Sequence, residues 1–123
     1  MFLFLCAYLE LVSLELHIAR DDFAAVYNLV RKCPVARDPV SSEQIEEVIS
    51  TMNTACIWYW KEVLCLQRSA ATARLLKKHG VLAEMVIGAR QIPFRAHAWV
   101  EVRGRVVNDK PYTPELYNVI DRC

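Results

Sequence analysis

Residues 65–80 read CLQRSAATARLLKKHG, a run with the composition of a helix. Alanine and leucine dominate it, Lys77 and Lys78 suit the negative end of the helix dipole, and Gly80 stands where a helix-ending glycine is expected. Cys65 then falls in the first turn, where unpaired backbone N–H groups and the positive end of the dipole favour thiolate over thiol. The segment predicts a helix that opens on a reactive cysteine, whose neighbouring N–H groups could also face an oxyanion.

A pair of strands is predicted further along the chain. Residues 96–102 and 105–109 flank Arg103-Gly104 and have the composition of a β-hairpin. A loop of only these two residues would require a positive φ at Arg103, which a side chain resists. We therefore expect a three-residue loop over residues 102–104, in which only the glycine needs a positive φ.

The register of this hairpin brings together residues that a cysteine nucleophile needs. The three-residue loop sets His97 opposite Asp109, with Cβ atoms about 5 Å apart, within reach of an imidazole–carboxylate hydrogen bond. It also sets Glu101 opposite Arg105, the simplest partner for that carboxylate. Cys65, His97 and Asp109 thus follow one another in the order nucleophile, base and orienting group. This order predicts a cysteine peptidase.

Several short motifs between residues 64 and 109 resemble one known family. In chain order they are Cys65-Leu66-x-Arg68-Ser69, Leu75-Leu76 with Gly80, Val86-Ile87-Gly88, Pro93-Phe94, Ala96-His97-Ala98-Trp99-Val100-Glu101, Gly104 and Asn108-Asp109. Their order and spacing are similar to those of the leader peptidases of lasso-peptide biosynthesis, small members of the transglutaminase-like, papain-related superfamily. The resemblance implies an α+β, transglutaminase-like (papain-like) fold. In that fold, N-terminal helices that include the catalytic-cysteine helix pack on a small antiparallel β-sheet.

The same resemblance implies an activity and partners. In this family a Cys-His-Asp triad cuts the leader from a ribosomally synthesised precursor peptide, through an acyl-enzyme, before a cyclase closes the macrolactam. These roles fall by motif on Cys65, His97 and Asp109, and no cofactor or metal is implied. A separate leader-binding protein is implied to present the precursor. This fits a chain of 123 residues with a hydrophobic content of 54%, which has little room to recognise a sequence and leaves apolar surface for a partner.

Three further residues are candidates for supporting roles. Arg68, one helical turn beyond the cysteine, is either solvated or in contact with a carboxylate such as Glu101 or with substrate. Trp99 lies two residues beyond the histidine on the same face, where it shields the triad from water or fills the core. The first oxyanion donor is expected to be the backbone N–H of the cysteine, and Trp60 is a candidate for the second. At least two of the aromatic residues 58–60 are expected in the core.

The whole chain has the size of one domain. We expect a single transglutaminase-like domain over residues 1–123, with a helical part at 1–61 and the catalytic helix plus sheet at 62–123. The net charge of +1, from 15 basic and 14 acidic residues, gives no sign of a nucleic-acid-binding surface. The five cysteines follow no disulfide or zinc spacing, so free thiols in a reducing cytoplasm are expected. A zinc site is an alternative, with the ligands Cys56, Cys65, His97 and Asp109.

The N-terminal segment is apolar but interrupted. Residues 2–9 read FLFLCAYL and could pass for an export signal, yet no basic segment precedes them. Glu10 and Glu15 break the apolar run short of the ~20 residues that a membrane-spanning helix needs, so we expect no membrane span. The pattern instead predicts an amphipathic helix over residues 1–19, with a polar stripe of Glu10, Ser13, His17 and Arg20.

Two more helices are predicted before the cysteine helix. An aspartate at position 21 or 22 caps the first of them, and residues 33–40, which include two prolines, form a loop. Ser41 and Gln44 form a capping box for the next helix, which is expected to pack under the cysteine helix.

Two elements complete the prediction. Residues 81–89 alternate as a strand, interrupted by the proline-containing segment 91–95. Thr113-Pro114-Glu115 predicts a final helix whose apolar face carries Leu116, Val119 and Ile120, and Cys123 is expected to fray.

Other functions stay open at this point. A noncatalytic scaffold of the same fold would bind the leader peptide or the cyclase. A triad also does not dictate whether water or an amine accepts the acyl group, so transferase chemistry is a further alternative. Alkylation by iodoacetamide separates scaffold from enzyme, because an activated Cys65 would react faster than the other four cysteines.

Overall fold

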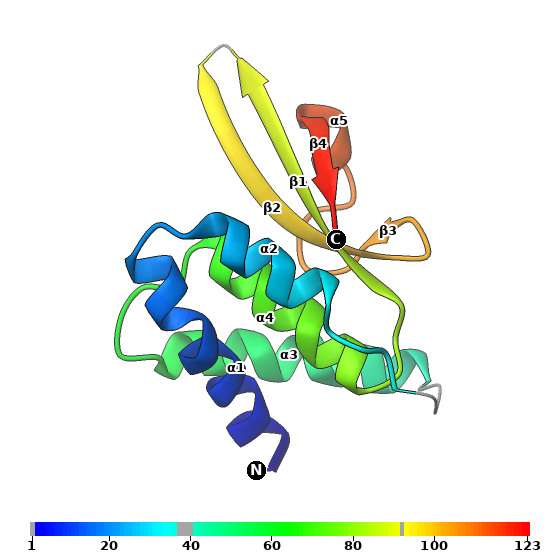
Figure 1. Ribbon diagram of the computed structural model, residues 1–123. Helices are drawn as coiled ribbons and strands as arrows, with labels where there is room; N and C mark the ends of the chain where they lie inside the picture. The colour runs from blue at the N-terminus through cyan, green and yellow to red at the C-terminus, as the bar shows by residue number, and fades with distance from the viewer. Residues whose placement is uncertain (1, 37–40, 92) are drawn as a thin grey trace.

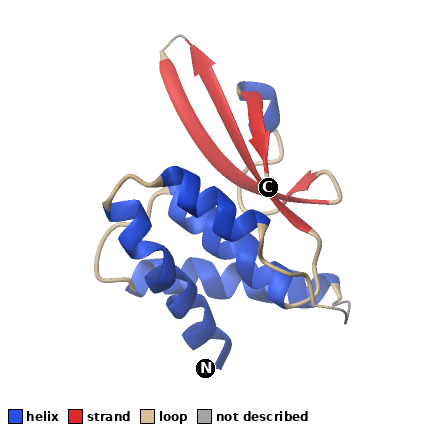
Figure 2. Cartoon of the chain, in the orientation of Figure 1, coloured by secondary structure: helices blue, strands red, loops and turns tan. Residues whose placement is uncertain are grey.

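A computed structural model describes residues 2–36, 41–91 and 93–123. Its elements, in chain order, are α1 (Phe2–Ala19), α2 (Phe23–Arg31), α3 (Ser42–Trp58), α4 (Cys65–Lys78), β1 (Ala83–Gln91), β2 (Phe94–Val102), β3 (Arg105–Val106), α5 (Thr113–Leu116) and β4 (Asn118–Arg122). The first four helices form one layer and the strands a second (Figure 1, Figure 2). The predicted α+β fold is confirmed. Part of the loop predicted at 33–40 lies outside the described residues.

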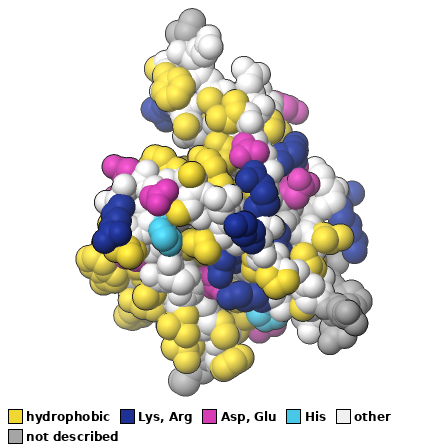
Figure 3. Space-filling model, in the orientation of Figure 1, with side chains coloured by type: hydrophobic (Ala, Val, Ile, Leu, Met, Phe, Trp, Pro, Cys, Tyr) yellow, Lys and Arg dark blue, Asp and Glu magenta, His cyan; other side chains and the backbone are white. Residues whose placement is uncertain are grey.

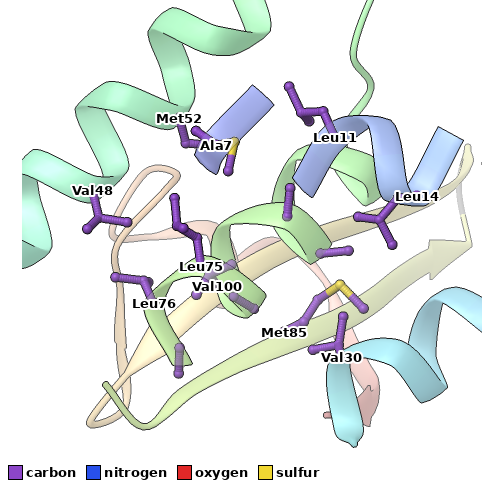
Figure 4. Close-up of a cluster of buried hydrophobic side chains, with 14 of the residues drawn as sticks. Ala7, Leu11, Leu14, Val30, Val48, Met52, Leu75, Leu76, Met85 and Val100 are labelled. Atoms are coloured by element: carbon purple, nitrogen blue, oxygen red, sulfur yellow. The ribbon is translucent and has the colours of Figure 1, made fainter. Parts of the chain in front are cut away.

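α4 lies at the centre of the core. Its Ala70, Ala71 and Ala73 are fully buried, and these small side chains let neighbouring elements approach the helix from several sides. Each large apolar side chain packed around α4 contributes about 1.5–3 kcal/mol through burial. Figure 4 shows this cluster, with labels on Ala7, Leu11, Leu14, Val30, Val48, Met52, Leu75, Leu76, Met85 and Val100. A helix enclosed in this way holds the residue at its start in a fixed place.

The helix ends follow the predicted signals. Ser41 Oγ accepts a hydrogen bond from the Gln44 N–H at 3.3 Å, and Gln44 Oε1 accepts one from the Ser41 N–H at 3.0 Å, so the capping box is confirmed. Asp22 caps α2 through the Ala25 N–H. Gly80 follows α4 with a φ of 86°, a left-handed conformation that glycine adopts readily. α3 packs against α4, as expected.

The sheet is antiparallel, with the strand order β3-β2-β1-β4. β1 and β2 pair along their whole length, from Ala83 with Val102 to Gln91 with Phe94. The strand predicted at 81–89 therefore starts two residues later and continues to Gln91. The far end of the β1–β2 hairpin projects beyond the helical layer (Figure 1).

The hairpin between β2 and β3 differs from the predicted one. Its loop contains only Arg103 and Gly104, and Arg103 adopts a positive φ of 54°. The paired residues are Glu101 with Val106 and Val102 with Arg105. A turn with two positive φ values matches the twist of its strands, which outweighs a left-handed cost of about 1–2 kcal/mol at an exposed residue. The predicted three-residue loop is wrong, and the strand predicted over residues 105–109 starts where expected but ends at Val106.

The C-terminal segment also differs from the prediction. α5 ends at Leu116, and residues 118–122 form β4 beside β1. Val119 and Ile120 are β-branched and favour a strand, for which the edge of β1 provides hydrogen-bond partners. The predicted helix through these two residues is wrong. Cys123, expected to fray, exchanges two backbone hydrogen bonds of 2.9 Å with Met85.

α1 presents apolar side chains to solvent. Glu10, from the predicted polar stripe, is only 4% exposed and forms ion pairs with Arg74 at 2.8 Å and with Lys78. The outer face carries side chains with exposed fractions of 46–80%, namely Phe2, Leu5, Leu9, Val12 and Leu16. Figure 3 shows hydrophobic side chains over the end of the molecule at which α1 begins. By length and by its mean hydropathy of 1.7, α1 could cross a membrane, a criterion that core helices and signal sequences also meet.

Candidate active site

Cys65 is the first residue of α4, as predicted. Leu64 precedes it in an extended conformation, and no side chain caps this end of the helix. The first turn contains no acidic residue. The first N–H groups of a helix have no intrahelical acceptor, so here they can face an anion that forms beside the sulfur. Cys65 as a residue is partly exposed.

Cys65 and His97 line the same cavity, which has a volume of about 440 Å³. Its walls come from the α1–α2 junction, the segment before α4, and strands β1 and β2. Most of the lining is apolar, with Phe23 from α2 and Ile87 from β1, and charged groups come from Asp21, Lys61 and Glu62. A space of this size and lining can hold part of a peptide against the thiol.

His97 is bonded to Asp109, as predicted. The pair is formed by His97 Nε2 and Asp109 Oδ2, and both side chains are mostly buried. Burial raises the pKa of Asp109, but hydrogen bonds from His97 and from the Lys110 N–H, together with the charge of Arg68, outweigh it and hold that pKa below its ordinary value. Asp109 is therefore ionised at neutral pH. Because Asp109 is bonded to Nε2 of His97, the ring nitrogen that remains for a second partner is Nδ1.

Asp109 reaches His97 by a route that the sequence analysis did not predict. The observed hairpin register, continued past β3, would set Lys110 opposite His97, so the register argument for the pair fails. The chain instead leaves the ladder after Val107, whose N–H donates to Val100 O at 2.9 Å. The Val100 N–H then donates to the side-chain oxygen of Asn108 at 2.7 Å. Because a side chain takes the place of the next backbone acceptor, the main chain is free to turn Asp109 toward the imidazole.

Ser69 joins the three segments that carry the candidate triad. Its hydroxyl donates to Ala98 O at 3.0 Å and accepts from Asn108 Nδ2 at 3.1 Å. Ser69 is fully buried in α4, one turn beyond Cys65. Sequence reasoning quoted Ser69 and Asn108 within motifs but gave them no role. The sequence feature that could have identified them is their position, because Ser69 lies one helical turn after Cys65 and Asn108 directly precedes Asp109.

Arg68, a candidate for a supporting role, and Glu101, one of its expected partners, do not contact each other in the way that was predicted. Arg68 is half-buried and its charge acts on Asp109. Within the described residues its Nε is buried without a hydrogen-bond partner. Glu101 accepts hydrogen bonds from Trp99 Nε1 at 2.9 Å and from an Arg122 guanidinium nitrogen at 3.0 Å. The predicted Glu101–Arg105 pair is therefore wrong, because Arg122 arrives on a strand that was not predicted.

Two aromatic rings surround the imidazole. Trp99 is fully buried, and its ring centroid lies 6.0 Å from that of His97. It is thus both a core residue and a neighbour of the imidazole. Tyr117, which sequence analysis missed, stacks on His97 with a centroid separation of 5.3 Å and an interplanar angle of 29°. Tyr117 lies between α5 and β4, the region mistaken for a helix, so its approach to the site was not visible in the pattern.

The aromatic residues before α4 do not form the core as expected. Trp58 and Trp60 are 72% and 68% exposed, and only Tyr59 is buried. The Trp60 ring packs beside Tyr59 and under the Lys61 ammonium, and Trp60 is not among the residues that line the cavity.

All five cysteines are unpaired. Burial raises the pKa of the Cys56 and Cys123 thiols. Within residues 2–36, 41–91 and 93–123, no three His, Cys, Asp or Glu side chains converge to hold a metal ion. The zinc alternative through Cys56 and the three triad residues thus has no support in these parts of the chain.

Comparison with known proteins agrees with the motifs. The family model described as the transglutaminase-like superfamily matches residues 8–122. The microcin J25-processing protein McjB of Escherichia coli is 45% identical to this chain over 56 residues, which are 46% of this chain and 27% of that protein. No solved structure matches the chain significantly. The family model includes most of α1 and β4, which lie outside the motifs. The chain belongs to the transglutaminase-like superfamily.

Proposed function

We propose that this chain is a cysteine peptidase that removes the leader from a ribosomally synthesised lasso-peptide precursor. The observation that carries the proposal is one cavity lined both by a cysteine at a helix N-terminus and by a histidine bonded to an ionised aspartate. The similarity to a protein named for processing microcin J25 supports a peptide substrate. In this proposal the nucleophile is Cys65, the base is His97 and the orienting group is Asp109.

The mechanism uses the ring nitrogen of His97 that is not bonded to Asp109. His97 Nδ1 takes the proton of the Cys65 thiol, and the thiolate attacks the scissile carbonyl. The carbonyl oxygen becomes an oxyanion that faces the N–H groups of the first turn of α4. His97 then gives its proton to the departing amine, leaving an acyl-enzyme on Cys65. A water molecule, deprotonated by the same nitrogen, hydrolyses the thioester and restores the thiol.

The remaining charges support this cycle. Asp109 stays ionised beside Nε2, so it fixes the tautomer of His97 and stabilises the imidazolium that forms during attack. Arg68 adds positive charge near Asp109 and helps to keep it ionised. Because the reaction needs a free thiol, we place the protein in a reducing cytoplasm.

Recognition of the precursor is proposed to involve partners. A separate leader-binding protein would present the precursor, and a macrolactam-forming cyclase would take the released peptide. The exposed apolar face of α1 offers one surface for such contacts. We expect slow cleavage by the chain alone and faster cleavage with the leader-binding protein.

The direct test is mass spectrometry of a candidate precursor incubated with the purified chain, with and without the leader-binding protein. The expected product is the precursor without its leader, and Cys65→Ala and His97→Ala are expected to yield none. Cys56→Ala, a change to a thiol packed beside the core, is the matched control and is expected to cleave. Full cleavage by Cys65→Ala or His97→Ala would overturn the proposal.

A noncatalytic scaffold is the second candidate, and the exposed face of α1 is the observation that favours it. Iodoacetamide separates the two functions without any substrate. An enzyme is expected to lose the Cys65 thiol well before the other four, whereas a scaffold would lose its thiols in order of exposure. Adding a primary amine to the cleavage reaction then tests for acyl transfer, because an amide product would appear in place of the acid.

A further inference from the structure

The C-terminal segment contacts the candidate base directly. Tyr117 stacks on His97 with ring centroids 5.3 Å apart, and Trp99 lies 6.0 Å from both rings. Asp109 holds the imidazole through Nε2. One hydrogen bond fixes a point on the ring but leaves it free to rock about that point, whereas a stacked ring restricts its plane.

Gly88 makes room for this arrangement. A Cβ atom at this position of β1 would lie 2.7 Å from Trp99 Cη2 and 2.8 Å from Tyr117 Cβ, closer than packed atoms approach. The φ of Gly88 is not in the left-handed region, so its backbone conformation is open to any residue. The absence of a side chain therefore serves the close approach of the two rings.

Further contacts hold the two rings in place. The Trp99 indole N–H donates to Glu101, and the other oxygen of that carboxylate accepts from Arg122 on β4. Arg122 itself pairs with Val86 in the ladder between β1 and β4. The Arg90 guanidinium of β1 lies over the Tyr117 ring, 5.9 Å from its centroid. The segment that carries Tyr117 is thus held to both β1 and β2.

We infer that Tyr117 is a positioning residue for His97. The stacked ring restricts the imidazole plane while Nε2 stays bonded to Asp109, so that Nδ1 is kept available on the wall of the cavity that Cys65 also lines. The inference rests on the proposed function for its kinetic consequence, but the contact itself is independent of any substrate.

The test compares variants that keep or remove the ring. Tyr117→Leu is expected to lower kcat about 10- to 100-fold with KM changed less than about twofold, because a misplaced base slows chemistry rather than binding. Tyr117→Phe keeps the ring and is expected to restore kcat to within about threefold of the wild type. Ile120→Ala, at an exposed position of β4, the strand that follows Tyr117, is the control and is expected to behave as the wild type.

A second readout needs no precursor. The rate of Cys65 alkylation by iodoacetamide, relative to Cys56, is expected to fall in Tyr117→Leu and in Gly88→Ala but not in Tyr117→Phe. Circular dichroism establishes that each variant compared is folded. Unchanged kcat and unchanged alkylation in folded Tyr117→Leu would overturn the inference, as would a Phe variant as slow as the Leu variant. If the wild type cleaves no precursor, the proposed function fails, and the alkylation ratios still decide the role of Tyr117.

Discussion

The two ends of the candidate site are built in different ways. Cys65 is placed by local sequence, since the helix formers that follow it and the uncapped first turn put it at the start of α4. Asp109 is placed by contacts between distant segments, through Asn108, Ser69 and the backbone of β2. The position of the nucleophile thus depends on one helix. The position of the carboxylate depends on three segments staying in register, so changes far from the chemistry should affect it more.

The largest effect is expected from removing the carboxylate itself. Asp109→Ala should lower kcat roughly 10²- to 10⁴-fold, because the imidazole loses the charge that fixes its tautomer and stabilises the imidazolium. Leader release followed by chromatography measures the loss. Asp121→Ala, which removes an exposed carboxylate bonded to Arg31, is the matched control and should keep its turnover. Wild-type turnover in Asp109→Ala would remove the distant end of the site from the mechanism.

A smaller effect is expected from the network that positions this carboxylate. Ser69→Ala leaves Ala98 O and Asn108 Nδ2 without their partner, so the free energy of unfolding should fall by about 1–3 kcal/mol. Urea denaturation measures this change. Ser13→Ala removes the hydroxyl of an exposed residue that donates to Glu10 O within α1, and should change stability by less than about 0.5 kcal/mol.

The same network predicts coupling between its members. Ser69→Ala and Asn108→Ala each break the hydrogen bond between them, so their combined effect should be smaller than the sum of the single effects by about 0.5 kcal/mol or more. Turnover should fall with stability, since both variants loosen the segment that carries Asp109. Additive effects, or unchanged turnover in both variants, would mean that Asp109 is placed by some other contact.

The parts of the fold that sequence predicts correctly are those with local causes. The capping box of Ser41 and Gln44, the glycine after α4 and the position of Cys65 each depend on residues within a few positions of one another. Such signals act in the same way in any fold. The resemblance of the motifs between residues 64 and 109 to one family was enough for the fold class and the superfamily.

The parts that sequence predicts wrongly have distant causes. Residues 118–122 become a strand because they pair with the edge of β1. Arg122 on that strand then binds Glu101, which was predicted to pair with Arg105. The contact between His97 and Asp109 was predicted from a register that does not occur. It forms because Asn108 replaces a backbone acceptor, which no pattern of strand alternation reveals. The sequence analysis therefore predicted the correct contact, between His97 and Asp109, from an incorrect hairpin register.

Low pH should remove the stability that the Asp109 carboxylate contributes, without affecting Cys65. The pKa of Asp109 is held below its ordinary value of 3.8, so the stability it contributes is complete above that value and is lost as the pH falls through the folded-state pKa. The stability advantage of the wild type over Asp109→Asn should therefore shrink between about pH 5 and about pH 2. Urea midpoints across this range measure it. Cys65→Ala should show the same acid dependence as the wild type, and a constant gap between wild type and Asp109→Asn would contradict the assignment.

The smallest effect tests the hairpin on which the distant end of the site rests. Arg103→Gly should raise the free energy of unfolding by about 0.5–1 kcal/mol, because glycine adopts the observed φ of 54° without the steric cost that a side chain carries. Arg95→Gly, at an exposed position within β2, should instead lower it by about 0.5–1 kcal/mol. Thermal denaturation of the two variants gives the signs. A destabilising Arg103→Gly would mean that the loop is not the two-residue turn, and the three-residue register would then return Asp109 to a direct position opposite His97, with no need for Asn108.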